Sequence, residues 1–502
     1  MEVTVPKITN LLASNVTETS FSDWLAATTY LAGARVYILY SDFPELLSYG
    51  DCIFDQFTVD GAEWTYDGTN SEYDCSGAQA GDTKIYQTTQ DVDSGDFILV
   101  IYEVKNYIAG EVKAYVQGGL GTARSANGTY LEVVTAGSTD SKIGVQGNVT
   151  FDGSITALSI KKIGAYYSRD VYESQAGANT NNYPPDDAVN WTKVSASNRW
   201  KMFDDYMASQ AENPAKISVK VKSNKCNKLA YFLVEAKSVE YIVSDDSTTE
   251  TSTTSITPAA AAIAITTQTH ANSWTIGDKV EVYNTADQRA FFAGTLTAWT
   301  QATGVGEVTA TVFDDPAGSA PYATWTMVKV YDHESGSLYQ EEVLSWSDYF
   351  FSPIRFSTSE AGSFTYSYNT SVRVIFTGNA NDTIRVGHLV VGHSSFLGGT
   401  KYGLKGNISD FSTKEANTFG EYALVKRAYS KELRYTINVF NTAVDQVFQT
   451  LTQLRATPCV WDSNNDKTSL SMAIAFGFFS DFEVMVPSNK LSECDLEIQG
   501  LT

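Results

Sequence analysis

The feature that most constrains this sequence is a dense series of short runs rich in β-branched and aromatic residues. Residues 96–102, 216–222 and 371–376 are examples, and the second alternates strictly between apolar residues and Lys or Ser. Such alternation is typical of half-buried strands. Clusters of Gly, Asn, Asp and Ser interrupt these runs at short intervals. The pattern predicts a mainly β protein built from sandwiches or barrels.

Length and charge narrow the protein class. A chain of 502 residues suggests about three domains by length alone. A hydrophobic fraction of 43% excludes wholesale disorder. No apolar run approaches the ~18 residues of a membrane-spanning helix, so we expect no membrane insertion. The net charge of −23 argues against a nucleic-acid partner, because phosphate binding needs clustered Lys and Arg.

Common catalytic and metal-binding motifs are absent from the sequence. The five cysteines show no CxxC spacing, and whether Cys52 and Cys75 pair stays open. His388 and His393 are five residues apart, so a regular strand points them to opposite faces. The sequence contains no HExxH, GxSxG, Walker A or GxGxxG pattern. We therefore expect no enzymatic activity of these common kinds.

One clear helix is predicted, at residues 442–455. Its apolar residues follow the i, i+3, i+4, i+7 spacing of a single face, and Thr442 with Asp445 resembles a capping pair. Strand patterns precede the helix at 432–440 and follow it at 470–476, which predicts a C-terminal β-α-β unit. The polar stretch Ser244–Ser255 predicts an exposed loop or linker, followed by a small β-module that is inserted into a larger domain.

The stretch from about Trp64 to Ile163 resembles a known type of module. Its core reads VKNYIAGEVKAYVQGG, and it closes with Phe-Asp-Gly-Ser-Ile before an alternating strand. This resembles the jelly-roll module of carbohydrate-binding type that recurs in bacteriophage tail fibres and secreted glycosidases. Residues 24–36 resemble the first half of a small chitin-binding-like module, whose second half reappears at residues 169–191, although Ala34 replaces that module's usual Asp.

Residues 198–204, with the sequence NRWKMFD, and several runs between residues 384 and 431 resemble a family of phage tail and fibre-associated virion proteins. The resemblance implies a non-enzymatic virion component with other phage tail proteins as partners. It implies a homo-oligomer as well, a trimer or hexamer, because tails are symmetric. We therefore expect four parts. Their expected boundaries are a split small β-module at 1–40 and 164–200, an inserted jelly-roll domain at 41–163, a larger β-rich tail domain at 201–245 and 326–502, and an inserted small β-module at 246–325.

Two groups of residues are candidate sites. Aromatic rings can stack on sugars, so Trp24, Tyr30, Tyr172 and Trp191 are candidate glycan contacts, or else the core of the small module. Jelly rolls of this type often hold a structural Ca²⁺, and Asp91, Asp93 and Asp96 around Gly95 offer oxygen ligands. The bidentate acid of an EF-hand loop is missing there, so a solvated acidic turn is the alternative. No other cofactor is expected.

The functional expectation is a structural component of a phage tail, such as a tail tip, fibre or appendage, that also contacts host surface polysaccharide. Two alternatives stay open. The first is a glycan-degrading enzyme of the cell surface or virion, although no long repeat typical of a β-helix is visible. The second is a purely architectural tail protein without a receptor role.

Overall fold

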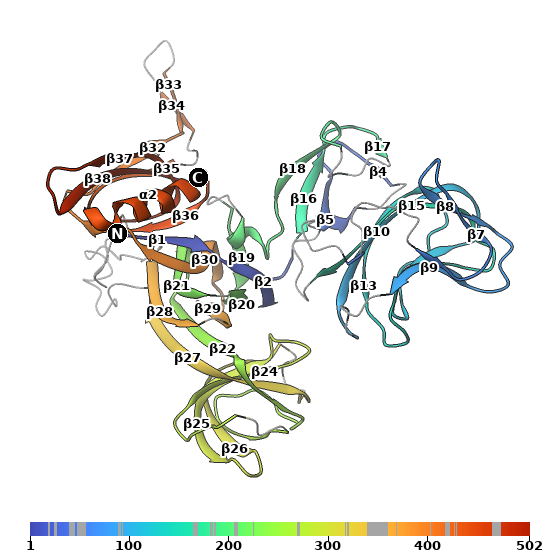
Figure 1. The fold of residues 1–502 in the computed structure, drawn as a ribbon, viewed down its shortest axis with the longest axis horizontal. Helices are drawn as coiled ribbons and strands as arrows, with labels where there is room; N and C mark the ends of the chain where they lie inside the picture. Colours follow the sequence, from blue (N-terminus) through green and yellow to red (C-terminus); the bar gives the residue numbers. More distant parts are fainter. Residues whose placement is uncertain are drawn as a thin grey trace. The chain divides into compact units, whose positions relative to one another are not determined.

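The computed structural model shows a mainly β protein (Figure 1). The chain divides into two compact units, unit 1 with residues Met1–Glu18 and Asn198–Thr502 and unit 2 with Thr19–Ser197. In the part of the chain that the structure describes, no helix is long and apolar enough to cross a membrane. The structure describes all residues except 19–20, 25–27, 40–45, 48–56, 89–91, 93, 164–168, 181–183, 185–186, 205–208, 224, 269–271, 317, 319–320, 339–359, 368, 402, 417–421, 426, 428, 464–472 and 502.

An antiparallel sheet of eleven strands forms one part of unit 1. The first strand of the chain lies in its interior, between two strands from the second half of the sequence, and the amino group of Met1 donates to the carbonyl of Gly398 at 2.5 Å. The strands, in spatial order, are β28 (Glu360–Ser367), β21 (Cys226–Glu235), β30 (Thr383–Phe396), β1 (Glu2–Pro6), β36 (Cys459–Asp462), β37 (Ile474–Met485), β38 (Leu491–Gly500), β35 (Tyr429–Phe440) and β31 (Gly399–Thr400), with β19 (Ala211–Pro214) on β30 and β32 (Lys405–Asp410) on β35.

A second antiparallel sheet of nine strands completes most of unit 1. The sheet includes strands from residues 246–325, which the sequence predicts as an inserted module. These strands hydrogen-bond in one continuous order with strands from outside that region. Its strands, in spatial order, are β2 (Ile8–Ser14), β20 (Lys216–Ser223), β29 (Thr370–Thr377), β22 (Ser238–Ser252), β27 (Trp325–Ser337), β24 (Lys279–Asn284), β25 (Phe291–Thr300), β26 (Val305–Asp314) and β23 (Ala262–Thr266).

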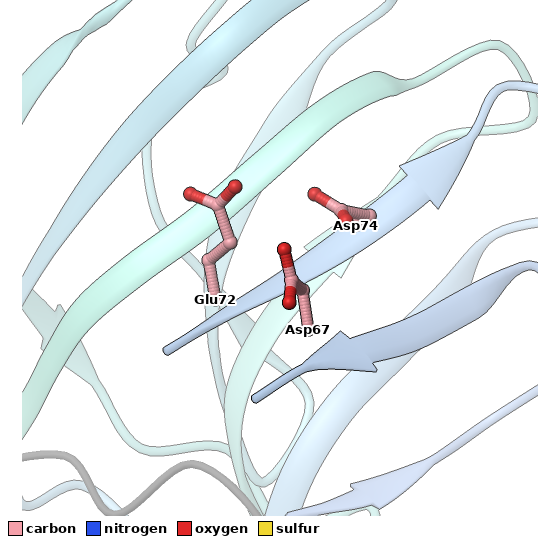
Figure 2. Close-up of side chains that lie close together, drawn as sticks. All are labelled: Asp67, Glu72 and Asp74. Atoms are coloured by element: carbon pink, nitrogen blue, oxygen red, sulfur yellow. The ribbon is translucent and has the colours of Figure 1, made fainter. Parts of the chain in front are cut away.

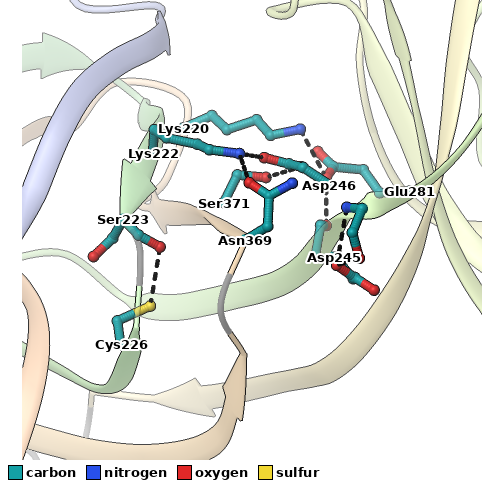
Figure 3. A network of polar contacts seen from close by, with 11 residues as sticks. Lys220, Lys222, Ser223, Cys226, Asp245, Asp246, Glu281, Asn369 and Ser371 are labelled. Atoms are coloured by element: carbon teal, nitrogen blue, oxygen red, sulfur yellow. Dashed lines mark hydrogen bonds and ion pairs between the residues drawn. The ribbon is translucent and has the colours of Figure 1, made fainter.

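The nine-stranded sheet curls strongly, and buried charges hold the curl. Lys220 on β20 and Glu281 on β24 are four strands apart in the sheet order, about 19 Å for a flat sheet. Yet Lys220 Nζ lies 3.0 Å from Glu281 Oε2, and both side chains are fully buried (Figure 3). Arg373 on β29 donates to the other carboxylate oxygen at 2.7 Å. The two cations hold the pKa of Glu281 at about 2 although burial alone would raise it.

The polar stretch at 244–255 is not the exposed loop that the sequence predicts. Strand β22 runs through most of it, and Ser244, Asp245 and Glu250 are buried. Partners on neighbouring strands satisfy the polar side chains: Ser244 Oγ donates to Glu281 Oε2 at 2.6 Å, and Tyr331 donates to Asp245 at 2.8 Å. Thr-rich sequence suits a strand, and hydrogen bonding removes the cost of its burial.

The predicted C-terminal helix is confirmed as α2 (Val444–Gln453). Its residues Val447 and Leu451 are buried against the eleven-stranded sheet, whereas Phe448 is 56% exposed. The expected capping pair is wrong: the N-cap of the helix is Ala443, which offers no side-chain hydrogen bond, and Thr442 lies in a 3₁₀ turn at Asn441–Ala443. The β-α-β unit is not confirmed: the strand pattern at 432–440 falls on β35 and the one at 470–476 partly on β37. These two strands are not neighbours, because β38 lies between them, and β36 comes between the helix and β37 in sequence.

Unit 2 contains a β-sandwich. Two five-stranded antiparallel sheets enclose one apolar core, to which Ile98 and Ile155 contribute from one sheet and Ile85 and Val145 from the other. The first sheet has β13 (Gly128–Thr135), β10 (Phe97–Ala109), β15 (Asp152–Ile163), β8 (Glu72–Ser76) and β7 (Trp64–Asp67). The second has β12 (Gly119–Leu120), β11 (Val112–Val116), β14 (Lys142–Gly147), β9 (Thr83–Thr88) and β6 (Thr58–Val59).

The rest of unit 2 is a small module of short strands. A four-stranded sheet contains β18 (Trp191–Ala196), β16 (Arg169–Ser174), β5 (Arg35–Leu39) and β3 (Ser22–Asp23), and β17 (Asn179–Thr180) pairs with β4 (Thr29–Tyr30). Residues before and after the sandwich in sequence therefore pair with one another, as in β5 with β16. The four boundaries expected from the sequence stay a prediction.

Candidate functional site

The four aromatic residues predicted as glycan contacts lie together in the small module. Trp24 and Trp191 are buried with Val36 and Ile38, and Tyr30 and Tyr172 pack against this cluster. The rings of Tyr30 and Trp191 meet edge to face, 5.2 Å between centroids. Because only 5% of Trp24 and 2% of Trp191 is exposed, the ring faces of the two tryptophans are taken up by packing. The arrangement favours the alternative role of these residues, as the core of the module.

The predicted acidic turn falls largely outside the described residues. Asp91 and Asp93 both lie outside them. Asp96 is described, and its carboxylate forms an ion pair of 2.6 Å with Lys162 Nζ. The Ca²⁺ site at these three residues therefore stays a prediction.

A different acidic group lies at the hairpin of β7 and β8 (Figure 2). Asp67, Glu72 and Asp74 each offer an oxygen within 4.8 Å of the others. Asp67 and Glu72 are directly opposite one another across the two strands, and Thr65 is opposite Asp74, so the alternation of strands puts all three carboxylates on one face. Sequence spacing alone does not single them out, because the turn between the strands brings them together.

The surroundings of the three carboxylates differ. Burial, and secondly the charge of Asp74, raise the pKa of Glu72, which accepts a hydrogen bond from Asn106 Nδ2 at 3.3 Å. Hydrogen bonds from the Thr69 backbone and the Asn70 amide lower the pKa of Asp67. Ser154 Oγ donates to Asp74 at 2.6 Å. Three carboxylates in this arrangement could bind a hard divalent cation such as Ca²⁺, which prefers oxygen ligands.

The outer face of the second sheet of the sandwich carries an aromatic row. Tyr115 on β11, Gly144 on β14 and Tyr86 on β9 are directly opposite one another across three neighbouring strands. Their neighbours Ala114, Ile143 and Ile85 are buried in the sandwich core, so the row faces outward. A Cβ atom at Gly144 would lie 2.0 Å from the carbonyl oxygen of Ile85. The floor between the two tyrosines therefore bears no side chain. Tyr86 is half-buried, whereas neighbouring side chains leave only 6% of Tyr115 exposed.

Lysines cover the rings of this row. Lys84 Nζ lies 4.7 Å from the centroid of the Tyr115 ring, and Lys142 Nζ lies 4.1 Å from that of Tyr86. Asp60 pairs with both lysines, at 3.8 Å and 3.2 Å. These contacts are cation–π interactions, whose ammonium groups also have protons to donate to a ligand.

Burial and neighbouring side chains shift the pKa values of Tyr115 and Lys142. Burial, and then the hydrogen bond from its hydroxyl to Asp140 at 2.7 Å, raise the pKa of Tyr115 to about 12. Burial alone would lower the pKa of Lys142, but Asp60 and Tyr86 together raise it. Near neutral pH Tyr115 is therefore a neutral phenol and Lys142 a charged ammonium group. We call Lys84, Tyr86, Tyr115, Lys142 and Gly144 the tyrosine face.

Sequence reasoning missed the tyrosine face. The alternation in KIY at 84–86 and KAY at 113–115 marks the outward positions of each strand. It does not tell which strands are neighbours, and strand order is what places Gly144 between the two tyrosines.

A scan against profiles of known protein families and a search of curated proteins both found no match to this chain.

Proposed function

We propose that this protein is a non-enzymatic structural component of a phage tail that contacts host surface polysaccharide through the tyrosine face. The sequence resemblance to tail and fibre-associated proteins supports the first half of this proposal. The observation that carries the second half is the half-buried Tyr86 beside the bare floor at Gly144, with the ammonium group of Lys142 4.1 Å from the centroid of its ring. We also propose that the sandwich is wound as a jelly roll, which its two five-stranded antiparallel sheets support.

The way unit 2 is inserted supports a display role. The chain leaves unit 1 after Glu18 and returns at Asn198. Within unit 1 these two points are fastened together, because Asn198 Nδ2 donates to the carbonyls of Thr17 and Glu212, each at 2.8 Å. A module that is inserted at one such point can vary in its loops and faces without disturbing the strands of unit 1.

The chemistry of the tyrosine face suits a sugar. Aromatic rings offer apolar faces to the C–H surface of a pyranose, and hydroxyl and ammonium groups hydrogen-bond its oxygens. Lysines at the rings favour a glycan that carries carboxylate or phosphate groups. Tyr115 is only 6% exposed and Gly144 is buried, so contact with a glycan falls to the half-buried Tyr86 and to the two lysines.

Binding of the full chain to a panel of bacterial surface polysaccharides, followed by affinity electrophoresis and calorimetry, tests this proposal. We expect Tyr86→Ala to weaken binding by about tenfold or more, because an aromatic contact at the centre of an interface contributes at least about 1.4 kcal/mol. Phe396→Ala is the matched control, because Phe396 lies in unit 1 and is 63% exposed.

Thermal unfolding of both variants should match that of the unchanged chain, so that lost binding is not lost folding. Equal binding by Tyr86→Ala and the unchanged chain would place any glycan contact elsewhere. Release of reducing sugar from a bound polysaccharide would contradict the non-enzymatic part of the proposal. Absence of the chain from purified phage particles would contradict the virion part.

A further inference from the structure

Lys228 is a buried lysine that contacts two carboxylates in the eleven-stranded sheet of unit 1. Its Nζ atom lies 2.6 Å from Asp462 Oδ2 and 2.6 Å from Glu2 Oε2. Only 2% of Lys228 and 5% of Asp462 is exposed, although the two residues are 234 positions apart in the sequence. Ser394 Oγ donates to Glu2 Oε2 at 3.1 Å. We call Lys228, Asp462 and Glu2 the lysine triad.

The order of the strands explains how the lysine triad is brought together. Lys228 lies on β21, Glu2 on β1 and Asp462 at the end of β36, and β30 lies between β21 and β1 (Figure 1). Glu2 and Asp462 are directly opposite one another on neighbouring strands, so their side chains share one face of the sheet. Gly392 on β30 is directly opposite Lys228 and has no side chain, which leaves room for the lysine to cross β30.

Burial makes the charged form of the lysine triad costly. An ion that is moved from water into a protein interior loses several kcal/mol of solvation, and two carboxylates directly opposite one another also repel. Burial alone would lower the pKa of Lys228, but Asp462 and Glu2 together raise it, so an ammonium group faces the two carboxylates. Conversion of this ammonium and one carboxylate into an amide would remove two of the three charges.

The geometry of Lys228 and Asp462 is suited to amide formation. The carboxyl carbon of Asp462 is bonded to the oxygen that lies 2.6 Å from Lys228 Nζ, so the nitrogen and this carbon are within about 4 Å of each other. Reacting atoms in a near-attack arrangement are about 3–3.5 Å apart, and groups held in this way react with effective molarities of about 10⁵–10⁸ M. Glu2 contacts the same nitrogen and is therefore placed to carry its protons.

We propose that Lys228 and Asp462 join in an isopeptide bond in the folded chain, with Glu2 as the proton carrier. Glu2 takes one proton from the ammonium group of Lys228 and passes it to the carboxylate of Asp462. The free amine then attacks the carboxyl carbon, where a C–N bond forms. Glu2 moves a second proton from the nitrogen to the departing oxygen, the C–O bond breaks, and water leaves. One ammonium and one carboxylate thus give one amide and one water, without any other reactant.

The bond would connect two strands that are not neighbours in the sheet. It would join β21 to β36 across β30 and β1, and it would close a loop that includes most of the second half of the chain. A covalent cross-link restricts the unfolded chain, and the effect grows with the length of the closed loop. Each chain reacts once, so the reaction involves no turnover of a substrate.

Intact-mass spectrometry of the denatured full chain tests the bond. We expect a mass that is lower than that of the sequence by one water molecule, and proteolysis should release a cross-linked pair of peptides that contain Lys228 and Asp462. Lys228→Arg should have the full mass of its own sequence, because a guanidinium group stays protonated and does not attack a carboxyl carbon. Lys329→Arg is the matched control and should keep the water loss. Lys329 also pairs with a carboxylate, Asp278 at 3.2 Å, but its side chain is 37% exposed.

Glu2→Gln tests the proton carrier. The amide of Gln has a similar size but does not take up a proton near neutral pH. In a time course of cell-free synthesis, we expect this variant to lose water at least about a hundredfold more slowly, as is usual when a general acid–base group is removed. Melting temperature checks that Glu2→Gln and Lys228→Arg stay folded.

Three results would overturn parts of this proposal. An unchanged chain with the full mass of its sequence would exclude the bond. A water loss that persists in folded Lys228→Arg would show that the water comes from other residues. Water loss at an unchanged rate in Glu2→Gln would exclude Glu2 as the proton carrier.

Discussion

At the scale of single residues, His388 shows how burial alone changes chemistry. The residue lies on β30, is 4% exposed and stacks on Phe476 with 4.0 Å between ring centroids. Burial lowers its pKa from 6.5 to about 3. Alternation in the sequence predicts a strand here, but it cannot tell that both faces of the strand are buried, which depends on the neighbours β1 and β21.

The pKa of His388 predicts a loss of stability in mild acid. The unfolded chain takes up a proton near pH 6.5 and the folded chain only near pH 3, so stability is complete above 6.5 and falls as the pH drops through this window. Between about pH 7 and pH 5 we expect a loss of about 2 kcal/mol. His388→Phe should remove most of this loss. Denaturant unfolding at both pH values measures it, and equal pH dependence in both chains would contradict the assignment to His388.

At the scale of elements, the sequence predicts strands and the one described α-helix well where their patterns are regular. The expected strands at 96–102, 216–222 and 371–376 correspond to β10, β20 and β29. The prediction of an exposed loop at 244–252 is wrong because burial of this stretch depends on polar partners such as Glu281, which are distant in sequence. The sequence does not predict the tyrosine face for a related reason. The order of strands in a sheet depends on contacts between distant residues, and local alternation does not reveal that order.

Helix α2 offers a matched pair of substitutions on two faces. Leu451 is 2% exposed and packs on the eleven-stranded sheet, whereas Phe448 is 56% exposed. We expect Leu451→Ala to lower the free energy of unfolding of unit 1 by about 2–4 kcal/mol, because it leaves a cavity. Phe448→Ala should cost less than about 1 kcal/mol. Urea unfolding followed by the signal of unit 1 compares the two, and equal costs would mean that the helix does not pack as described.

At the scale of the whole molecule, the order of the chain explains why length alone does not give its division into two compact units. Length suggests about three domains. In the structure, β1 and β2 at the start of the chain pair with β30 and β20, which follow unit 2 in sequence. The sheets of unit 1 are therefore complete only when both segments are present, and unit 2 interrupts them in sequence. A long interruption costs little free energy when its ends meet, because loop-closure entropy grows slowly with length.

This reasoning predicts that unit 1 folds without unit 2. The chain leaves and re-enters unit 1 beside the hydrogen bond from Asn198 to Thr17, so a short Gly-Ser linker in place of residues 19–197 can join the ends. Calorimetry should show that the shortened chain keeps a cooperative transition within a few degrees of that of unit 1 in the full chain, since the buried network of Lys220, Glu281 and Arg373 stays intact. The shortened chain should no longer bind glycan, because the tyrosine face lies in unit 2. Loss of the transition would show that unit 2 is part of the fold of unit 1, and retained glycan binding would place the glycan site in unit 1.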